Sequence, residues 1–374
     1  MLEIYFWQII VSPHMADLAV SLVQRGYKVF YVAQHSMSAE RKALGWLPPA
    51  LTDVTLLFAE NDGAARALAI EAGPNSIHLC QGVRANGIIK AAQTTLEKRG
   101  LQYWAIMETV DDSGMRGLLK RIEYRRILKS HRRSIQGILA NGHSTADWFS
   151  ARGFPRDQVF PFAYFLPTPK ITFSPASAKK NCFRFIFVGQ FIQRKRIDWL
   201  INSLAKLKDK SFELWIVGTG ACEIQLKLLA EEKLGQRVRW VGQLTLPQVP
   251  VVMSQADCLV LPSLHDGWGA VASEALMIGT PVICSEGCGV AGVVRNSGCG
   301  GVFATDNFDE LTHLLARQIE KGQVDEELRR KIIEWSDCLN STRGAEYLHE
   351  ILKFSRDTDN IRPAAPWSKP AITL

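Results

Sequence analysis

Short apolar runs alternate with longer amphipathic segments along the whole chain. Apolar runs of this kind are typical of strands buried on both faces of a parallel sheet, and the segments between them are typical of covering helices. The pattern therefore predicts an α/β fold. In the first half of the chain, the predicted strands are 3–11, 28–33, 54–59, 76–79, 103–107 and 137–140, with helices such as 14–25 between them.

The same alternation starts again at Phe183 and predicts a second domain of the Rossmann type. Its predicted strands are 183–188, 213–217, 238–241, 258–261 and 281–284, and its predicted helices lie near 196–208, 221–234, 270–278 and 308–320. Pro and Ser residues gather over 166–181, which predicts a linker. The predicted organisation is a first domain over 1–168, a second over 182–340, a helix over 341–354 that packs back on the first domain, and a disordered tail over 355–374.

The composition limits the class of protein. With 374 residues, 47% of them hydrophobic and 22% charged, the chain can build two cores, and it is not collagenous or coiled-coil. No apolar stretch approaches the roughly 18–20 residues that cross a bilayer, and the first residues lack the basic region of a signal peptide, so we expect a cytoplasmic protein. The eight cysteines form no CxxC pair, which argues against zinc and disulfides and predicts buried thiols.

The net charge of +7 raises the question of nucleic-acid binding. The sequence has no RNP-like, zinc-finger or recognition-helix signature, so we expect no nucleic-acid partner.

The most informative segment is the loop 262–269, which joins a predicted strand to a predicted helix. Gly267 and Gly269 let its backbone N–H groups and the positive end of the helix dipole face the mouth of the sheet, where phosphate can bind. Asp266 in the loop and Glu274 on the helix can accept hydrogen bonds from sugar hydroxyls. Taken alone, either carboxylate also fits a turn or a solvated helix face, and only the combination points to a site.

A second candidate follows the predicted strand 183–188, where Gly189 begins a basic loop. In open α/β sheets, ligands bind at the carboxyl ends of the strands. Arg194 and Lys195 can therefore clamp a diphosphate and neutralise its charge as it leaves. The alternative is that both cations belong to a solvated helix start.

A third motif, Gly218-Thr219-Gly220, resembles part of a dinucleotide fingerprint, but Glu223 stands where the third Gly belongs. An NAD-dependent oxidoreductase would also need an acidic residue about 20 positions further on, at the end of the next strand. That region starts with Arg237 and then becomes apolar, so this alternative ranks low.

Four segments, FVGQFIQRKRID, WIVGTG, VRWVGQL and LPSLHDGWGAVASEALMIGTPVI, follow one another in this order. Together they resemble the carboxyl-terminal domain of glycosyltransferase family 4, whose members are retaining enzymes of the GT-B fold. Asp266 and Glu274 are similar in spacing to the E-x7-E motif of that family, with Asp in the first position. The resemblance is strong from 183 to about 305, and it implies a GT-B architecture with two Rossmann-like domains facing across a cleft.

The resemblance also implies roles for individual residues. Glu274 should hold the ribose hydroxyls of a sugar nucleotide, and Asp266 should lie near the donor sugar. Lys195 matches the diphosphate-binding Lys, and Arg194 can replace the family's Arg, which is Gln190 here. The other donor-binding positions that it implies are Gly189, Gly218, Gly220, Val241, Gly242, Gly267 and Gly269.

In the first domain, His78 is the nearest match to the His that the family carries in its catalytic pocket. The alternative for His78 is a buried core histidine. Ser12-Pro13-His14-Met15 replaces the usual pair of glycines in the first loop, and His14 fits helix capping, acceptor binding or chemistry equally well.

The segment 116–133 carries eight Arg or Lys and one Glu, interleaved with apolar residues. A helix of this kind can lie on anionic lipid, although a solvated face is the commoner explanation. Because many relatives act on lipid-linked saccharides, an anionic membrane surface is an expected partner, which would place the protein peripherally on the inner face of the membrane.

The expected function is therefore a retaining, hexosyltransferase-type transfer from a nucleoside-diphosphate sugar to a saccharide or lipid-linked saccharide, in surface polysaccharide or lipopolysaccharide biosynthesis. The resemblance implies no obligatory metal and no cofactor besides the donor. A GT-B sugar-nucleotide epimerase, which would use the same donor pocket without an acceptor, is the alternative.

Overall fold

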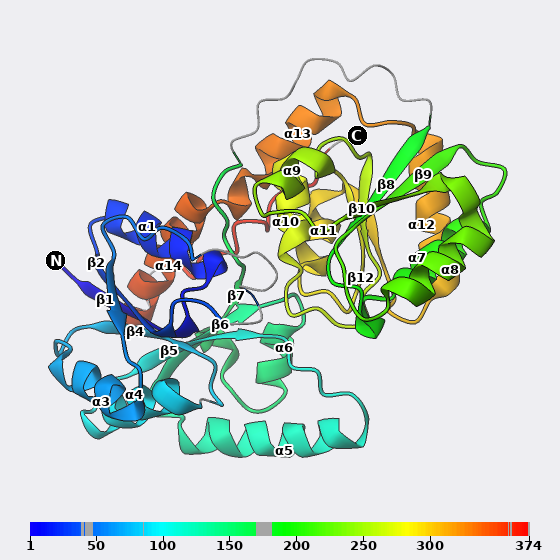
Figure 1. Ribbon diagram of the computed structural model, residues 1–374. Coiled ribbons are helices and arrows are strands. Elements are labelled where there is room, and N and C mark those ends of the chain that lie inside the picture. Colours follow the sequence, from blue (N-terminus) through cyan, green and yellow to red (C-terminus); the bar gives the residue numbers. More distant parts are fainter. Residues whose placement is uncertain are drawn as a thin grey trace. The chain divides into compact units, whose positions relative to one another are not determined.

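The computed structural model describes residues 1–38, 41, 48–84, 86–169, 182–357, 359 and 361–372. The chain divides into two compact units (Figure 1). The first unit contains Met1–Pro167 and Leu339–Pro366, and the second contains Thr168–Cys338 and Trp367–Leu374. The boundary at Pro167 falls in the segment 166–181 that the sequence predicts as a linker, of which 170–181 lies outside the described residues.

The first unit is built on a sheet of seven parallel strands. These are β1 (Glu3–Ile10), β2 (Lys28–His35), β3 (Thr55–Phe58), β4 (Ile77–Gln81), β5 (Tyr103–Glu108), β6 (Ile135–Asn141) and β7 (Val159–Phe162). Their order in the sheet is β3-β2-β1-β4-β5-β6-β7. This is the strand order of a Rossmann fold, extended by one strand.

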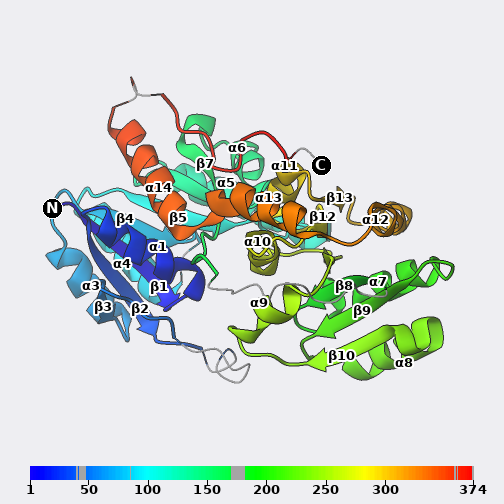
Figure 2. The same cartoon turned by 90° about the horizontal axis from the view of Figure 1, so that it is seen from above.

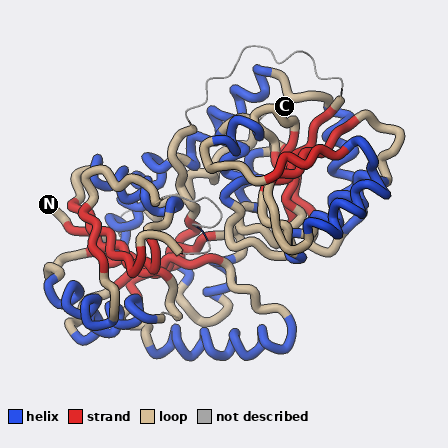
Figure 3. Tube along the Cα trace, in the orientation of Figure 1, coloured by secondary structure: helices blue, strands red, loops and turns tan. Residues whose placement is uncertain are grey.

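Helices cover both faces of this sheet, as Figure 3 shows. They are α1 (Pro13–Gln24), α3 (Asp62–Glu71), α4 (Gly87–Lys98), α5 (Gly114–Ser130), α6 (Thr145–Ser150) and α14 (Ser341–Arg356). Helix α14 lies beside α1 in Figures 1 and 2 and contacts it, so this helix from the end of the second half of the chain packs in the first unit. On the opposite face, α3, α4, α5 and α6 bury apolar side chains in one core with the sheet.

Local signals place helix α1 where the sequence predicts a helix. Pro13 stands at the first helical position, where its missing N–H costs nothing and its fixed φ favours the helix. Gly26 follows the helix with a φ of +87°, the left-handed conformation that commonly ends helices.

The second unit has a sheet of six parallel strands in the order β10-β9-β8-β11-β12-β13. Its strands are β8 (Phe183–Val188), β9 (Phe212–Val217), β10 (Val238–Gly242), β11 (Cys258–Leu261), β12 (Val282–Ser285) and β13 (Gly300–Phe303). Its helices are α7 (Ile197–Ala205), α8 (Glu223–Leu234), α9 (Gln248–Met253), α10 (Ala270–Met277), α11 (Ala291–Ser297), α12 (Phe308–Lys321) and α13 (Glu326–Ser336).

In both sheets the strand order reverses between two central neighbours, β1 and β4 in the first unit and β8 and β11 in the second. Ligands of open α/β sheets bind outside the carboxyl ends of the strands at such a reversal. The fold therefore selects the loops after β8 and β11 as the ligand-binding edge of the second unit.

Two strands of the sheets are absent from the sequence prediction. Strand β7 contains Pro161, which lacks an N–H and is tolerated because β7 is an edge strand. Strand β13 begins with Gly300 and Gly301 and forms by pairing with β12. Pro161 argues against a strand in the apolar run of β7, and β13 carries no distinctive apolar run, so the tertiary pairing identifies both strands.

The structure differs from the prediction of a disordered tail. The Arg362 guanidinium donates to the carbonyls of Asp157 and Val159 at 2.6 and 2.7 Å. Further along, Trp367 is buried, and Trp335 Nε1 donates to the Pro370 carbonyl at 3.0 Å. The tail residues that make these contacts lie in no helix or strand, and their partners are distant in sequence, so the local composition does not indicate the contacts.

Candidate functional site

Two loops meet at the strand-order reversal of the second unit. The loop after β8 ends in a short 3-10 turn, Gln193–Lys195, and the loop after β11 leads into α10. Arg194 Nη1 donates to the carbonyl of His265 at 2.6 Å, and Leu264 N donates to the carbonyl of Arg194 at 2.8 Å. The structure thus brings together the two motifs that the sequence singles out.

Lys195 and Asp266 form an ion pair at this junction. Both side chains are largely buried, with exposed fractions of 13% and 17%. Arg194 is exposed and has no carboxylate partner in the described part of the chain, so one positive charge stays available to an anion.

The loop that carries Asp266 is fixed by backbone hydrogen bonds to the loop after β12. Asp266 N donates to the carbonyl of Gly287, and Gly289 N donates to the carbonyl of Asp266, both at 2.9 Å. Gly269 then turns the chain into α10 with a φ of +89°, a conformation that disfavours other residues. The N-terminus of α10, which favours anions, is therefore held rigidly at the carboxyl edge of the sheet.

Glu274 lies on α10 and is partly buried. No described residue donates a hydrogen bond to its carboxylate or pairs with it. Burial without a partner raises the pKa of Glu274 to about 7. An unpartnered, partly desolvated carboxylate is a strong acceptor for hydroxyl donors, in keeping with the role that the sequence predicts.

Gly218 and Gly220 have a packing role in the structure. A Cβ on Gly218 would lie 2.0 Å from the carbonyl oxygen of Gly189, and one on Gly220 would lie 2.6 Å from that of Phe191. The loop after β8 therefore packs directly on the turn after β9. This contact accounts for both glycines without a dinucleotide.

Val241 and Gly242 lie at the carboxyl end of the edge strand β10. The carbonyl of Gly242 accepts a hydrogen bond from Gly218 N at 2.9 Å. The structure thus places these positions beside the turn after β9, at the same edge of the sheet as the N-terminus of α10.

His78 lies near the amino end of β4, at the edge opposite to the carboxyl ends. Its ring is fully buried, and burial lowers its pKa to about 3. Trp7 Nε1 donates to Nδ1 at 3.1 Å, which leaves the proton of the neutral ring on Nε2. That nitrogen lies 2.9 Å from Ser76 Oγ, which donates to the Gly73 carbonyl at 2.6 Å.

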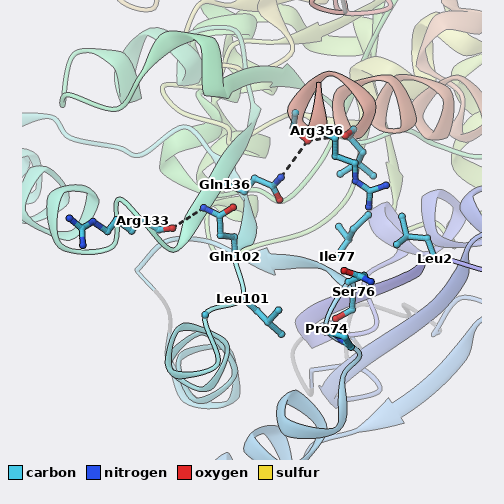
Figure 4. Close-up of a pocket in the computed structure, with 13 residues that line it drawn as sticks. Leu2, Pro74, Ser76, Ile77, Leu101, Gln102, Arg133, Gln136 and Arg356 are labelled. Atoms are coloured by element: carbon cyan, nitrogen blue, oxygen red, sulfur yellow. Dashed lines mark hydrogen bonds between the residues drawn. The ribbon is translucent and has the colours of Figure 1, made fainter. Parts of the chain in front are cut away.

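These contacts are those of a structural histidine, the alternative that the sequence leaves open. Ser76 and Ile77 line a pocket at the amino edge of the sheet, shown in Figure 4 together with Arg133 and Arg356. His78 therefore holds the wall of this pocket from inside the core. It does not reach the carboxyl edge, where ligands of this sheet are expected.

We expect His78→Leu to reduce the free energy of unfolding by about 2–4 kcal/mol, because Trp7 Nε1 and Ser76 lose buried partners. Urea unfolding at pH 7 measures this loss. The exposed His313 on α12 provides a matched control, and His313→Leu should change stability by less than about 0.5 kcal/mol. A wild-type stability together with a thousandfold loss of turnover in His78→Leu would instead make His78 catalytic.

At the carboxyl edge of the first unit, the structure assembles residues that the sequence analysis does not combine. The His14 ring stacks on Tyr164 with centroids 4.9 Å apart, and the Tyr164 hydroxyl donates to Glu108. Burial lowers the pKa of His14 to about 4, so its ring is neutral at pH 7. Glu108 carries a signal in the sequence, because it directly follows the predicted strand 103–107, whereas the place of Tyr164 after β7 becomes evident only in the structure.

The cysteines follow the sequence prediction, since all eight are free thiols and six are buried. Within the described ranges, no three His, Cys, Asp or Glu side chains are grouped so as to hold a metal ion. A separate search of the same residues finds no helix that is long and apolar enough to span a bilayer.

A protein-family model matches most of the second unit. Residues 170–336 match the family model described as "Glycosyl transferases group 1". The amylovoran biosynthesis glycosyltransferase AmsK of Erwinia amylovora is 24% identical over 220 residues, 54% of this chain and 54% of that protein. The chain spans about half the length, or less, of the curated relatives that it matches first.

Solved structures match nearly the whole chain. The apo form of the lipopolysaccharide outer core galactosyltransferase WaaB has a TM-score of 0.71 at 16% identity, covering 96% of this chain and all of that one. HepE of Anabaena in complex with UDP-glucose has a TM-score of 0.70 at 15% identity and covers 94% and 100% of the two chains. These likenesses confirm the predicted GT-B fold with two Rossmann-like units, and none of them supports the epimerase alternative.

Proposed function

We propose that the protein is a retaining glycosyltransferase similar to family 4, which moves a sugar from a nucleoside-diphosphate sugar to a saccharide or lipid-linked saccharide. The observation that carries this proposal is the junction of Arg194 and Lys195 with the loop that leads into α10, together with an unpartnered Glu274 on that helix. Cations and helix N–H groups suit a diphosphate, and the carboxylate suits ribose hydroxyls. One edge of one sheet thus offers both halves of a sugar-nucleotide site.

The chemistry follows from where charge develops. As the bond between the sugar and the diphosphate breaks, negative charge grows on the diphosphate, and fixed positive groups stabilise that charge most in the transition state. Arg194 and Lys195 supply this positive charge, so the proposed mechanism needs neither a metal ion nor a strong protein base. The acceptor hydroxyl attacks the oxocarbenium-like sugar from the face that the leaving group occupies and passes its proton to an oxygen of the departing diphosphate, so the anomeric configuration is retained.

Asp266 has a positioning role in this proposal. Its ion pair holds Lys195 in place before the donor arrives, and its backbone is fixed to Gly287 and Gly289. When a diphosphate approaches Lys195, the Asp266 carboxylate can turn toward the donor sugar, where the resemblance implies that it lies. Because the ion pair already fixes the Lys195 side chain, donor binding costs this side chain little further conformational entropy.

The first unit is the proposed acceptor side. Its carboxyl edge carries His14, Tyr164 and Glu108 in contact with one another, and aromatic rings beside hydrogen-bonding groups suit sugar rings. WaaB is described as a lipopolysaccharide core enzyme and AmsK as an amylovoran enzyme. On that basis we infer a role in surface polysaccharide or lipopolysaccharide assembly, in the cytoplasm and at the membrane surface.

A panel of sugar nucleotides tests the proposal. We expect one UDP or GDP sugar to raise the melting temperature of the wild-type protein and to release free nucleoside diphosphate when an acceptor is present. Glu274→Ala should lose the thermal shift, since the ribose hydroxyls lose their acceptor, while Glu231→Ala on the exposed face of α8 should keep it. A shift with NAD and with no sugar nucleotide would contradict the proposal.

A further inference from the structure

Helix α5 has two apolar faces on opposite sides. Gly117, Tyr124 and Leu128 are buried, and the last two belong to the core between the helices and the sheet. The opposite side carries large apolar side chains that remain exposed, with exposed fractions of 85% for Met115, 53% for Leu118, 68% for Leu119 and 44% for Ile122. Packing of α5 on its own unit therefore leaves a second apolar stripe in solvent.

The spacing shows that these four side chains form one surface. Leu118, Leu119 and Ile122 follow Met115 by three, four and seven positions, which places all four on one side of a helix. We call this set the α5 stripe. Figure 1 shows α5 as a long helix at the margin of the first unit. Contiguous exposed apolar surface of this kind marks an interaction site in soluble proteins.

Positive charge surrounds the α5 stripe. The basic residues of this segment are Arg116, Lys120, Arg121, Arg125, Arg126, Lys129, Arg132 and Arg133. Of these, only Arg121 pairs with a carboxylate of the described residues, that of Asp112 at 2.8 Å. The one acidic residue inside the helix, Glu123, is itself paired with Arg84 at 2.9 Å. The surface is thus an apolar stripe within a field of largely uncompensated cations.

We propose that α5 lies in the plane of an anionic bilayer surface, with the α5 stripe in the boundary between headgroups and acyl chains and the surrounding cations at lipid phosphates. A helix that carries exposed apolar residues on one side and Lys or Arg around them binds membranes in this way. Its core-facing side stays packed on the sheet, so binding requires no unfolding of the first unit.

The positive charge around the α5 stripe, together with its apolar side chains, favours an anionic bilayer over a second copy of the chain and over a nucleic acid. A second copy of the chain that docked through the same stripe would bring the same cations face to face, which opposes association. A nucleic acid would satisfy the cations but not the apolar side chains among them. An anionic bilayer satisfies both.

The inference deepens the proposed function and rests on it only for the acceptor, because a lipid-linked saccharide is presented at such a surface. Binding to the membrane is therefore measured without donor or acceptor. If the donor panel fails, vesicle binding still tests α5, and if vesicle binding fails, the donor chemistry stands.

The experiment is flotation of the full chain with vesicles of phosphatidylcholine, with and without phosphatidylglycerol. We expect the protein to float with the anionic vesicles and to bind neutral ones at least about tenfold more weakly. Leu118→Ser with Leu119→Ser should reduce binding to anionic vesicles about tenfold or more, because two inserted side chains are lost. Arg125→Gln with Arg126→Gln should also weaken binding and reduce its dependence on salt.

Helix α8 offers a matched control for the apolar variant. Ile224 and Leu228 are 76% and 69% exposed and stand one turn apart, so Ile224→Ser with Leu228→Ser removes as much exposed apolar surface elsewhere. This control should bind vesicles like the wild type, and both double variants should keep the wild-type melting temperature. Failure of the wild type to float with anionic vesicles, or equal binding by the Leu118 and Leu119 variant, would overturn the proposal. So would a dimer in sedimentation velocity that the same two substitutions dissociate.

Discussion

Glu274→Gln is expected to stabilise the ligand-free protein at pH 8 by about 1–3 kcal/mol. The folded state holds the Glu274 proton with a pKa of about 7, above the ordinary value of 4.5. Between these two values the folded state binds more protons than the unfolded state, so the contribution of Glu274 to stability falls as the pH rises through this window. Above pH 7 the folded protein carries the full penalty of a desolvated charge, which Gln removes.

Urea unfolding of the two proteins at pH 4.5 and pH 8 measures this effect. The difference should be small at pH 4.5, where Glu274 is protonated in the folded state and about half protonated in the unfolded state, and should reach its full size at pH 8. Glu231→Gln on the exposed face of α8 is the matched control and should show no such dependence. A Glu274→Gln protein that is less stable at pH 8 would mean that the carboxylate has a stabilising partner.

The same substitution should abolish tight donor binding. In the proposed site two ribose hydroxyls donate to the ionised Glu274 carboxylate, and losing hydrogen bonds to a charged group weakens binding about 100-fold. Because the ionised form is required, the wild-type Kd should rise about tenfold for each pH unit below 7, whereas the variant should show no such trend. Isothermal titration with the donor identified in the panel measures both, and an unchanged Kd in the variant would place the ribose elsewhere.

Lys195→Met is expected to lower kcat by about 10²–10³, since the leaving diphosphate loses a fixed cation where its charge develops. Release of nucleoside diphosphate under saturating donor measures the loss. Lys206→Met, which removes an exposed lysine whose Nζ lies 3.0 Å from Asp309, should leave kcat unchanged.

Measurements of stability distinguish a catalytic role of Lys195 from a role in packing alone. Lys195→Met leaves the largely buried Asp266 carboxylate without its cation and should destabilise the protein by about 1–3 kcal/mol. Combining it with Asp266→Asn removes the unpaired charge and should restore much of the stability without restoring kcat. Recovery of turnover in the double variant would show that Lys195 acts only by neutralising Asp266.

The prediction from sequence succeeded best where one segment carries the whole signal. The apolar runs identified β1 and β8 because strands buried on both faces need apolar side chains at nearly every position. The loop 262–269 was recognisable because its glycines, its carboxylate and the following helix are contiguous. The edge strand β7 was missed because Pro161 argues against a strand, and β13 was missed because it begins with two glycines; pairing with a neighbour makes both of them strands.

His78 illustrates the opposite case. Its sequence context resembles that of a functional histidine, yet strand register places it beside Tyr5 at the amino end of β4 and under Trp7. The carboxyl end of β4 is Gln81, three residues further along the same strand. A local motif does not record how far along a strand a residue stands relative to the ligand-binding edge.

The sequence by itself determined the α/β class, the two-part organisation and the residue types of the proposed sugar-nucleotide site, because these follow from local periodicity and contiguous motifs. The tertiary structure decided which of those residues meet. It joined Lys195 to Asp266, left Glu274 without a partner, buried His78 and exposed the α5 stripe. Burial and pairing depend on segments far apart in the chain, so the charge and the exposure of a side chain become fixed only when the sheets assemble.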